Sequence, residues 1–333
     1  MQTAENILEL AGGTPLIKIK KLNPYKHLTL LAKLEMFNPG GSVKDRMAFH
    51  ILSQAEKEGK IKPGDALVDN TSGNTGIGVA IFAAVRGYRA VLTIPDRMSE
   101  EKINLLRAYG AEVVVCPSEA PITDPESAYC KAETIAAQTG GFRLNQYHNQ
   151  ANPEAHYLTT GPEIWEQTDG RVDIFVAGIG TGGTCSGVGR FLKEKNPNIR
   201  VVAVDPKGSI FKAYIEKGVE IQPKAYKLEG IGSEMVTEAL DTSVIDEVLE
   251  VGDGDAFRMT RELACSEGIL AGGSSGAALW ACLEVARRFP EPATVVTVFP
   301  DTGLRYLSRY FNDEWMENSG YLKKKQTKTS LVR

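Results

Sequence analysis

The sequence predicts an α/β fold with mainly parallel sheets and helices on both sheet faces. Short apolar, β-branched runs alternate with amphipathic stretches from residue 66 onward. The predicted strands cover residues 66–69, 90–94, 111–115, 172–177, 201–204 and 294–298. A glycine-rich or helix-like segment follows these strands, which is typical of consecutive βαβ units. Ligands of such sheets bind at the carboxyl ends of the strands, so the loops there are where chemistry is expected.

Helix boundaries are predicted from glycine, proline and capping residues. Helices are expected over residues 76–85 and 99–109. Asp124-Pro125 predicts the start of another helix, with an N-cap residue followed by a proline at the first helical position. Gly59 is expected to end a helix that starts near Lys44.

Bulk properties exclude several classes of protein. The chain has 333 residues and a formal net charge of −4, which disfavours a nucleic-acid partner. No apolar stretch is long enough to cross a bilayer, so no membrane association is expected. The five cysteines form no CxxC pair, and the four histidines show no metal-ligand spacing. These features predict a cytoplasmic protein with reduced thiols and no metal site.

The first segment with possible chemistry is residues 38–46, Asn-Pro-Gly-Gly-Ser-Val-Lys-Asp-Arg. Ser42 and Asp45 have the spacing of a capping box, with Asp in place of the usual Glu. Lys44 is therefore expected in the first helical turn, where the helix dipole disfavours an ammonium group. A neutral amine is the form that makes a Schiff base. Taken alone, the segment is more typical of a surface lysine.

The second segment is residues 71–76, Thr-Ser-Gly-Asn-Thr-Gly, between a predicted strand and a predicted helix. Hydroxyls, a carboxamide and free backbone N–H groups at a helix start can hold a carboxylate or a phosphate. The same residue types also favour an ordinary N-cap and turn. Residue types alone leave both interpretations open.

The third segment, residues 178–184, follows an apolar strand and contains Gly178, Gly180 and Gly183 in a GxGxxG pattern. Asp205 ends the next predicted strand, where a ribose-binding acid would stand, so a dinucleotide-binding oxidoreductase is an alternative. Thr181 and Thr184 add hydroxyls that suit a phosphate monoester better. A fourth segment, residues 272–276, precedes a predicted helix over 277–288 and alone indicates only a helix start.

Together these four segments closely resemble the fold-type II pyridoxal-phosphate (PLP) enzymes of the cysteine synthase and cystathionine β-synthase family. They occur in the family's order and approximate spacing, and the resemblance extends from Gly13 to about Leu322. It implies a two-lobed, tryptophan synthase β-like fold that binds PLP and forms a homodimer. The smaller lobe is expected over residues 42–147, the larger over 1–41 and 148–322, and a basic flexible tail over 323–333.

The resemblance also implies roles for individual residues. Lys44 matches the lysine that binds the cofactor aldehyde and acts as the catalytic base. The other cofactor-binding residues are expected to be Asn74, Gly180, Thr181, Gly182, Gly183, Thr184 and Ser274. The substrate carboxylate is expected to bind Thr71, Ser72, Gly73, Thr75 and Gln146. Asp301, at the end of a strand, is expected near the cofactor ring.

Several segments resemble cystathionine β-synthase more than cysteine synthase, namely residues 146–149, 229–232, 272–274 and 313–316. Relatives that use phosphoserine have a basic residue about where Glu229 stands, so an acid disfavours that donor. Ser233 departs from the aromatic or small residue common at its position, which bears on the choice of acceptor. The expected protein is a compact cystathionine β-synthase that lacks the haem and regulatory domains.

The implied reaction is a β-replacement on L-serine or an activated serine, through an α-aminoacrylate. Homocysteine as the acceptor gives cystathionine. The alternatives are a cysteine synthase that uses O-acetylserine and sulfide, and a diaminopropionate-type synthase that uses an amine. A different class of protein, an inactive homologue that binds a partner, is disfavoured by the intact Lys44, Asn74, Gln146 and Ser274.

Overall fold

The fold is built on two β-sheets, and all but one of their described strand pairs are parallel. The computed structural model describes residues 3–71 and 73–323. The larger sheet has the strand order β1 (Leu16–Lys18), β2 (Leu28–Leu34), β10 (Ala293–Phe299), β7 (Ile174–Gly178), β8 (Arg200–Pro206) and β9 (Glu247–Val251). Only β1 runs antiparallel to its neighbour among these described strands. The smaller sheet has the order β5 (Glu112–Cys116), β4 (Arg89–Pro95), β3 (Ala66–Asn70) and β6 (Phe142–Arg143).

Both faces of the larger sheet are covered, as the apolar strand sequences predict. Along β7, Ile174 and Val176 pack into one core, whereas Phe175 and Ala177 pack into the other. The first core is covered by α9 (Asp253–Glu262) and α10 (Gly273–Arg288). The second is covered by α6 (Thr160–Gln167), α7 (Gly183–Lys195) and α8 (Phe211–Lys217). The alternation of side chains along each strand therefore builds two separate apolar layers.

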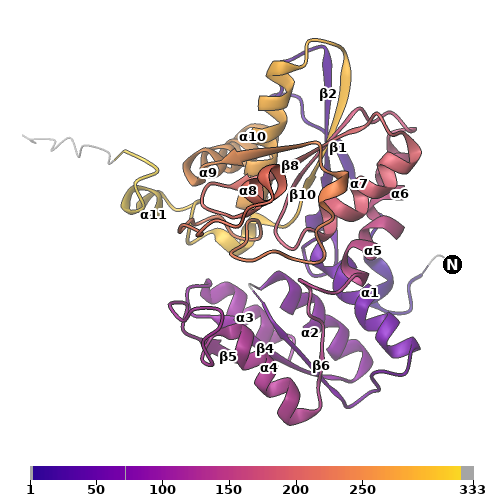
Figure 1. Cartoon of the computed structure of the whole chain (residues 1–333), viewed down its shortest axis with the longest axis vertical. Coiled ribbons are helices and arrows are strands. Elements are labelled where there is room, and N and C mark those ends of the chain that lie inside the picture. Colours follow the sequence, from indigo (N-terminus) through magenta and orange to yellow (C-terminus); the bar gives the residue numbers. More distant parts are fainter. Residues whose placement is uncertain (1–2, 72, 324–333) are drawn as a thin grey trace, which may run out of the picture.

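The smaller sheet has its own helices and its own core. These helices are α1 (Lys44–Lys57), α2 (Asn74–Arg86), α3 (Glu100–Ala108) and α4 (Ala128–Thr139). Buried Met47, Leu67 and Phe82 belong to one cluster that joins α1, β3 and α2. Figure 1 shows this sheet in the lower part of the molecule and the larger sheet above it. The exact lobe boundaries near residues 42 and 147 stay a prediction.

Two further helices complete the described chain. Helix α5 (Ala151–Leu158) packs against both α1 and α7, so it connects the helices of the two sheets. Helix α11 (Asp313–Asn318) follows a 3₁₀ turn at Gly303–Tyr306. Of the predicted basic tail only Lys323 is among the described residues.

One predicted helix start is wrong by about one turn. Helix α4 begins at Ala128, not at Asp124-Pro125, and Ser127 is its N-cap residue. The Ser127 hydroxyl oxygen accepts a hydrogen bond from the Cys130 backbone N–H at 3.1 Å. Asp124 and Pro125 lie in the preceding turn, where the Asp124 carboxylate accepts from the Glu126 N–H at 2.8 Å. Asp124 therefore caps the preceding turn, and Ser127 caps the helix.

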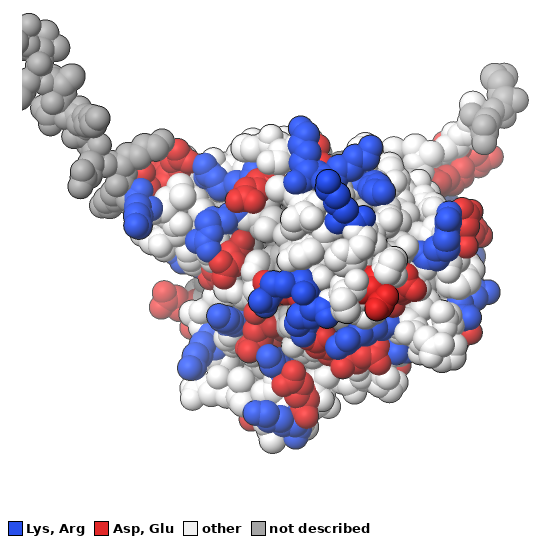
Figure 2. All heavy atoms as spheres, turned by 90° about the horizontal axis from the view of Figure 1, so that it is seen from above, with Lys and Arg blue, Asp and Glu red and all other residues white. Residues whose placement is uncertain are grey.

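The described surface carries mixed charge. Figure 2 shows Lys and Arg side chains interspersed with Asp and Glu on the face seen there. Among the described residues, no helix has the length and apolar character required to cross a membrane.

Candidate active site

Lys44 is the first residue of α1 and is half-buried. Burial lowers the pKa of its amine to about 8, while the Asp301 carboxylate opposes that change. Desolvation prevails because the charged form loses more hydration than one carboxylate returns. Lys44 therefore has a neutral, nucleophilic fraction near physiological pH, as its predicted place in the first helical turn also favours.

The predicted capping box between Ser42 and Asp45 does not form. The N-cap position belongs to Val43, and the Ser42 hydroxyl instead accepts from the Lys44 backbone N–H at 3.3 Å. The Asp45 carboxylate accepts from the Gly40 N–H at 2.5 Å, so it holds the turn before the helix. A Cβ on Gly40 would lie 2.5 Å from Asp45 Oδ1, which makes glycine necessary there. Burial raises the pKa of Asp45 to about 7.

The second predicted segment forms a tight turn at the start of α2. Gly73 is the N-cap residue with φ of +119°, a conformation that favours glycine. The Thr71 hydroxyl oxygen accepts from the N–H groups of Gly73 and Gly76, at 2.9 and 3.0 Å. The Thr75 hydroxyl donates to Gln146 Oε1 at 2.8 Å. Ser72 lies outside the described residues.

Asn74 is held by two partners from the segment after β10. Its Nδ2 donates to Asp301 Oδ2 at 2.8 Å, and its Oδ1 accepts from the Arg305 guanidinium. Arg305 also donates to the Gly40 carbonyl, in the loop before Lys44. The Tyr306 hydroxyl donates to the same Asp301 oxygen at 2.6 Å. The Asn74 amide therefore has a fixed orientation, in which one Nδ2 hydrogen remains free for a ligand.

The fourth predicted segment is the first turn of α10, which begins at Gly273 rather than at residue 277. Ser274 is buried there, and the Gly273 N–H donates to the Tyr310 hydroxyl at 2.7 Å. The Gly272 N–H donates to the Asp301 carbonyl at 3.0 Å. A Cβ on Gly272 would lie 1.9 Å from Asp301 Oδ1, and that oxygen has no partner among the described residues.

The third predicted segment forms the N-terminus of α7. Asn152 Nδ2 donates to Thr181 Oγ1 at 2.9 Å and to the Gln146 carbonyl at 2.8 Å. A Cβ on Gly182 would lie 2.6 Å from the Leu240 backbone, and one on Gly183 would lie 2.0 Å from Asn152 Oδ1. The glycines therefore let the loop pack closely while its backbone N–H groups stay at a helix start, where anions bind.

Asp205, the residue that suggested a dinucleotide site, is used differently. Its carboxylate is buried and accepts from the Lys212 N–H at 3.0 Å. Burial raises the pKa of Asp205 to about 7. This carboxylate binds a backbone N–H in the first turn of α8, so it gives no support to ribose binding.

Glu229 forms ion pairs with two cations. Lys102 Nζ lies 2.5 Å from one Glu229 oxygen, and Arg309 Nη1 lies 2.9 Å from the other. The sequence predicted that an acid at 229 disfavours a phosphorylated donor. Arg309 also interacts with the Glu101 carboxylate. The group therefore holds two cations and two carboxylates, and the preference against a phosphorylated donor stays a prediction.

The contacts join all four predicted segments. The segment before Lys44 meets Asp301 through an isolated bridge at Ser42, and Asp301 in turn contacts Asn74 and Gly272. Thr75 contacts Gln146, which is linked through Asn152 to Thr181. Sequence reasoning did not identify five side chains that support the site, namely Asn152, His156, Arg305, Tyr306 and Tyr310. Each of them also has a partner from a segment distant in sequence, and no local pattern marks that contact.

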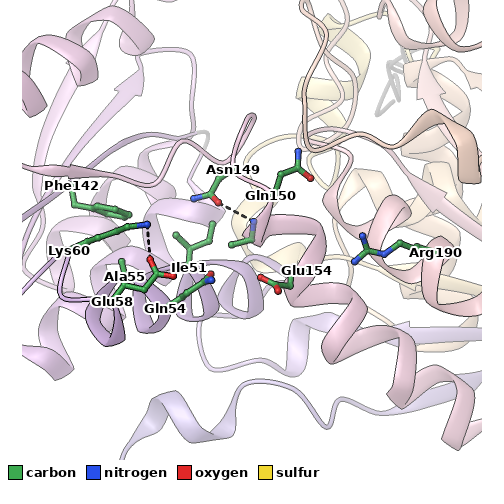
Figure 3. A pocket seen from close by; sticks show the side chains of 11 residues that line it. Ile51, Gln54, Ala55, Glu58, Lys60, Phe142, Asn149, Gln150, Glu154 and Arg190 are labelled. Atoms are coloured by element: carbon green, nitrogen blue, oxygen red, sulfur yellow. Dashed lines mark hydrogen bonds and ion pairs between the residues drawn. The ribbon is translucent and has the colours of Figure 1, made fainter.

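A cavity elsewhere holds none of these residues. It has a volume of about 390 Å³ and lies between the end of α1 and the start of α5. Figure 3 shows Gln54, Glu154 and Arg190 around it. Open, charged walls and the distance from the four segments make it a surface groove rather than the reaction site.

Comparisons with known proteins agree with this geometry. A model of the family described as "Pyridoxal-phosphate dependent enzyme" matches residues 7–301. Cysteine synthase of Staphylococcus aureus (strain N315) is 46% identical over 305 residues, which cover 91% of this chain and 96% of the relative. Cystathionine beta-synthase of Apis mellifera is 44% identical over 320 residues, which cover 95% of this chain and 63% of the relative.

A solved structure is similar in its fold as well. The crystal structure of O-ureido-L-serine synthase matches with a TM-score of 0.85 and 39% identity. The match covers 92% of this chain and 94% of that one. These relatives have different names for their reactions, so the comparisons fix the family and leave the substrates open.

Proposed function

Because the chain belongs to the pyridoxal-phosphate-dependent β-replacing enzymes, we propose that it joins serine or an activated serine to homocysteine and gives cystathionine. The observation that carries a reaction at this site is the continuous set of contacts from the Lys44 segment through Asp301 to Asn74. The choice of homocysteine rests on the sequence around residues 229–232 and 313–316, which resembles cystathionine β-synthase.

The residues of the site fit PLP. Lys44 supplies an amine with a lowered pKa for the aldehyde. The loop over residues 180–184 offers backbone N–H groups and two threonine hydroxyls for the phosphate. Asn74 has a free amide hydrogen for the ring oxygen, and Ser274 offers a neutral hydroxyl to the ring nitrogen. When bound, PLP acts as an electron sink for bonds at the amino acid's α-carbon.

The chain's own groups account for binding and proton transfer. The substrate carboxylate would bind at the start of α2, where the Thr71 hydroxyl and the Gln146 amide would donate to it. The Thr75 hydroxyl would orient that amide through its hydrogen bond to Gln146 Oε1. The Lys44 amine would accept the α-proton as a general base and later return it. Its pKa of about 8 leaves both protonation states populated between about pH 7 and 9.

A cysteine synthase activity is the second candidate. It is supported by the 46% identity with the Staphylococcus aureus enzymes over 96% of their length. An amine acceptor, as in diaminopropionate synthesis, is a further option within the same chemistry.

We also propose a cytoplasmic homodimer. Several apolar side chains are exposed on the single chain, including Phe37 (63%), Leu304 (59%), Leu10 (53%) and Leu307 (49%). Exposed apolar groups of this size favour burial in an interface. Multi-angle light scattering of the purified protein should give twice the chain mass; a monomer at micromolar concentration would contradict the proposal.

Product analysis tests the function directly. The holoenzyme is incubated with L-serine or O-acetyl-L-serine, each with homocysteine, sulfide or an amine, and products are identified by mass spectrometry. We expect cystathionine to form fastest. Faster cysteine formation from O-acetylserine and sulfide would favour the second candidate, and no β-replacement product with any pair would exclude both.

A further inference from the structure

A buried histidine stands directly behind the loop over residues 180–184. His156, on α5, is only 1% exposed. Its Nε2 lies 3.3 Å from Thr184 Oγ1, in the first turn of α7. Its Nδ1 lies 2.9 Å from Thr160 Oγ1, at the start of α6. The imidazole therefore links the loop to a threonine in the interior.

The hydroxyl hydrogens decide which ring nitrogen carries the proton. Thr160 is fully buried, and among the described residues His156 Nδ1 is the partner found for its hydroxyl. If Nδ1 carried a hydrogen, it would donate to Thr160 Oγ1, and the Thr160 hydroxyl hydrogen would be left without an acceptor. Buried hydroxyls are rarely left in that state. When Thr160 donates to Nδ1 instead, the single ring hydrogen must be on Nε2.

The surroundings favour the neutral imidazole. Burial lowers the pKa of His156 well below its usual range. The positive charges of Arg46, Lys44 and His50 lower it further, and only Glu163 acts in the opposite direction. A second ring hydrogen is therefore disfavoured by burial and by the positive charges on α1, against the single opposing carboxylate on α6.

We propose that His156 is a positioning residue whose Nε2–H donates to Thr184 Oγ1 and so leaves the Thr184 hydroxyl hydrogen free to donate to a phosphate monoester. A phosphate offers only acceptors, so it requires donors around it. With the opposite tautomer, Nε2 would accept the Thr184 hydroxyl hydrogen, and the threonine would present only lone pairs. This inference rests on the proposed function, since it assumes that residues 180–184 receive the cofactor phosphate.

The tautomer can be measured without any cofactor. The apoenzyme is labelled with ¹⁵N-histidine, and the His156 signals are assigned among the four histidines by their loss in His156→Gln. We expect a protonated Nε2 and an unprotonated Nδ1. An Nδ1–H tautomer, or a ring protonated on both nitrogens at pH 7.5, would overturn the proposal. The tautomer is read in the wild-type chain, and His156→Gln serves only to assign its signals.

Cofactor affinity tests the consequence. Dissociation constants of PLP and of pyridoxal, which lacks the phosphate, are measured for the apoenzyme by fluorescence titration. His156→Leu should weaken PLP binding by about tenfold and leave pyridoxal binding unchanged, since the Thr184 hydroxyl loses the donor that directs its hydrogen toward the charged phosphate. His156→Gln should retain most of the affinity, because its amide N–H can replace Nε2–H.

Thr184→Val separates this inference from the proposed site. We expect it to weaken PLP binding as His156→Leu does, and the double variant should be no weaker than Thr184→Val alone. If Thr184→Val leaves the ratio of PLP to pyridoxal affinity unchanged, the loop does not bind the phosphate, and the site in the proposed function fails. If Thr184→Val lowers the ratio and His156→Leu does not, only the role of His156 fails.

Discussion

Two groups of buried charge flank the start of α1, and they differ in how fully their members are partnered. On one side, Arg46 donates to Glu35 at 2.7 and 2.9 Å and to Glu163 at 2.7 Å through two nitrogens. Lys33 Nζ lies 2.7 Å from Glu163 and also donates to the Thr14 carbonyl at 2.6 Å. On the other side, Asp45 Oδ1 and Asp301 Oδ1 have no partner among the described residues. We call the first group the Arg46 cluster and the second the Lys44 side.

The pKa values of Glu163 and Lys44 reflect this difference in pairing. Burial alone would raise the pKa of Glu163, but its bonds to Arg46 and Lys33 prevail and lower it to about 2. Burial prevails at Lys44, whose pKa falls to about 8 with only Asp301 opposing. Dense pairing keeps charges fixed and serves stability, whereas sparse pairing leaves a group able to gain and lose a proton. Residues two positions apart on one helix thus have different tasks.

Removal of the Lys44 amine should have the largest effect, and it should fall on activity. Lys44→Ala is expected to lower the rate of β-replacement by about 10³-fold or more, since the base that moves the α-proton is lost. Its unfolding free energy should change by less than about 1 kcal/mol, because the amine has few partners. Product formation and urea unfolding measure the two quantities. Lys57→Ala, at the exposed end of the same helix, is the control and should change neither.

Removal of the Arg46 guanidinium should have its effect on stability. Arg46→Leu leaves Glu35 and Glu163 without their main counter-charge and should lower the unfolding free energy by about 3–5 kcal/mol. Urea unfolding at neutral pH measures it. Arg86→Leu is the matched control, since Arg86 is half-exposed and 3.9 Å from Glu56, and should cost less than about 1 kcal/mol. Equal losses of unfolding free energy in the two variants would mean that the buried ion pairs of Arg46 stabilise the fold no more than an exposed ion pair does.

The sequence indicated which segments form the candidate site, but not which side-chain contacts join them. The segments around Lys44, Asn74 and residues 180–184 carry glycines and hydroxyls that mark them as loops before helices. These local patterns left their chemistry open, and the resemblance to the family supplied the expected roles. The Asn74–Arg305 and Asn74–Asp301 contacts join residues more than 200 positions apart, and no local pattern encodes them. The capping box at Asp45 failed for a local reason, because the Asp45 carboxylate accepts from the Gly40 N–H five residues earlier.

Glu163 in the Arg46 cluster and Asp45 on the Lys44 side should change the unfolding free energy with pH in opposite directions. The pKa of Glu163 is about 2 in the folded chain against an ordinary 4.5. Its contribution is therefore present above pH 4.5 and lost as the pH falls toward 2, and it amounts to about 3 kcal/mol. Glu163→Gln should remove this acid-limb slope in urea unfolding between pH 4.5 and 2, and it should lower stability at neutral pH.

Asp45 provides the contrast for that measurement. Its pKa is raised to about 7 by burial, so the stability it contributes is present below pH 3.8 and lost as the pH rises toward 7. Asp45→Asn should flatten the slope between about pH 4 and 7 and leave the slope below it intact. Identical pH profiles for the two variants would show that Glu163 and Asp45 do not titrate with opposite signs.

The smallest expected effect concerns how readily Lys44 captures its cofactor. With a pKa of about 8, roughly 10% of the amine is neutral at pH 7, and this fraction rises about tenfold per pH unit below 8. The rate at which the apoenzyme takes up PLP, followed by stopped-flow absorbance, should rise with that slope and level off above pH 8.

Asp301→Asn sharpens the test, because it removes the one carboxylate that favours the charged amine while keeping an acceptor for Asn74. The rate profile should then move to lower pH, by an amount that reports the Asp301 charge alone. A profile that stays in place would mean that Asp301 acts on Lys44 only through the Asn74 and Tyr306 hydrogen bonds. A rate that does not change with pH would mean that the Lys44 amine is neutral throughout the range measured. Its pKa would then lie well below 8.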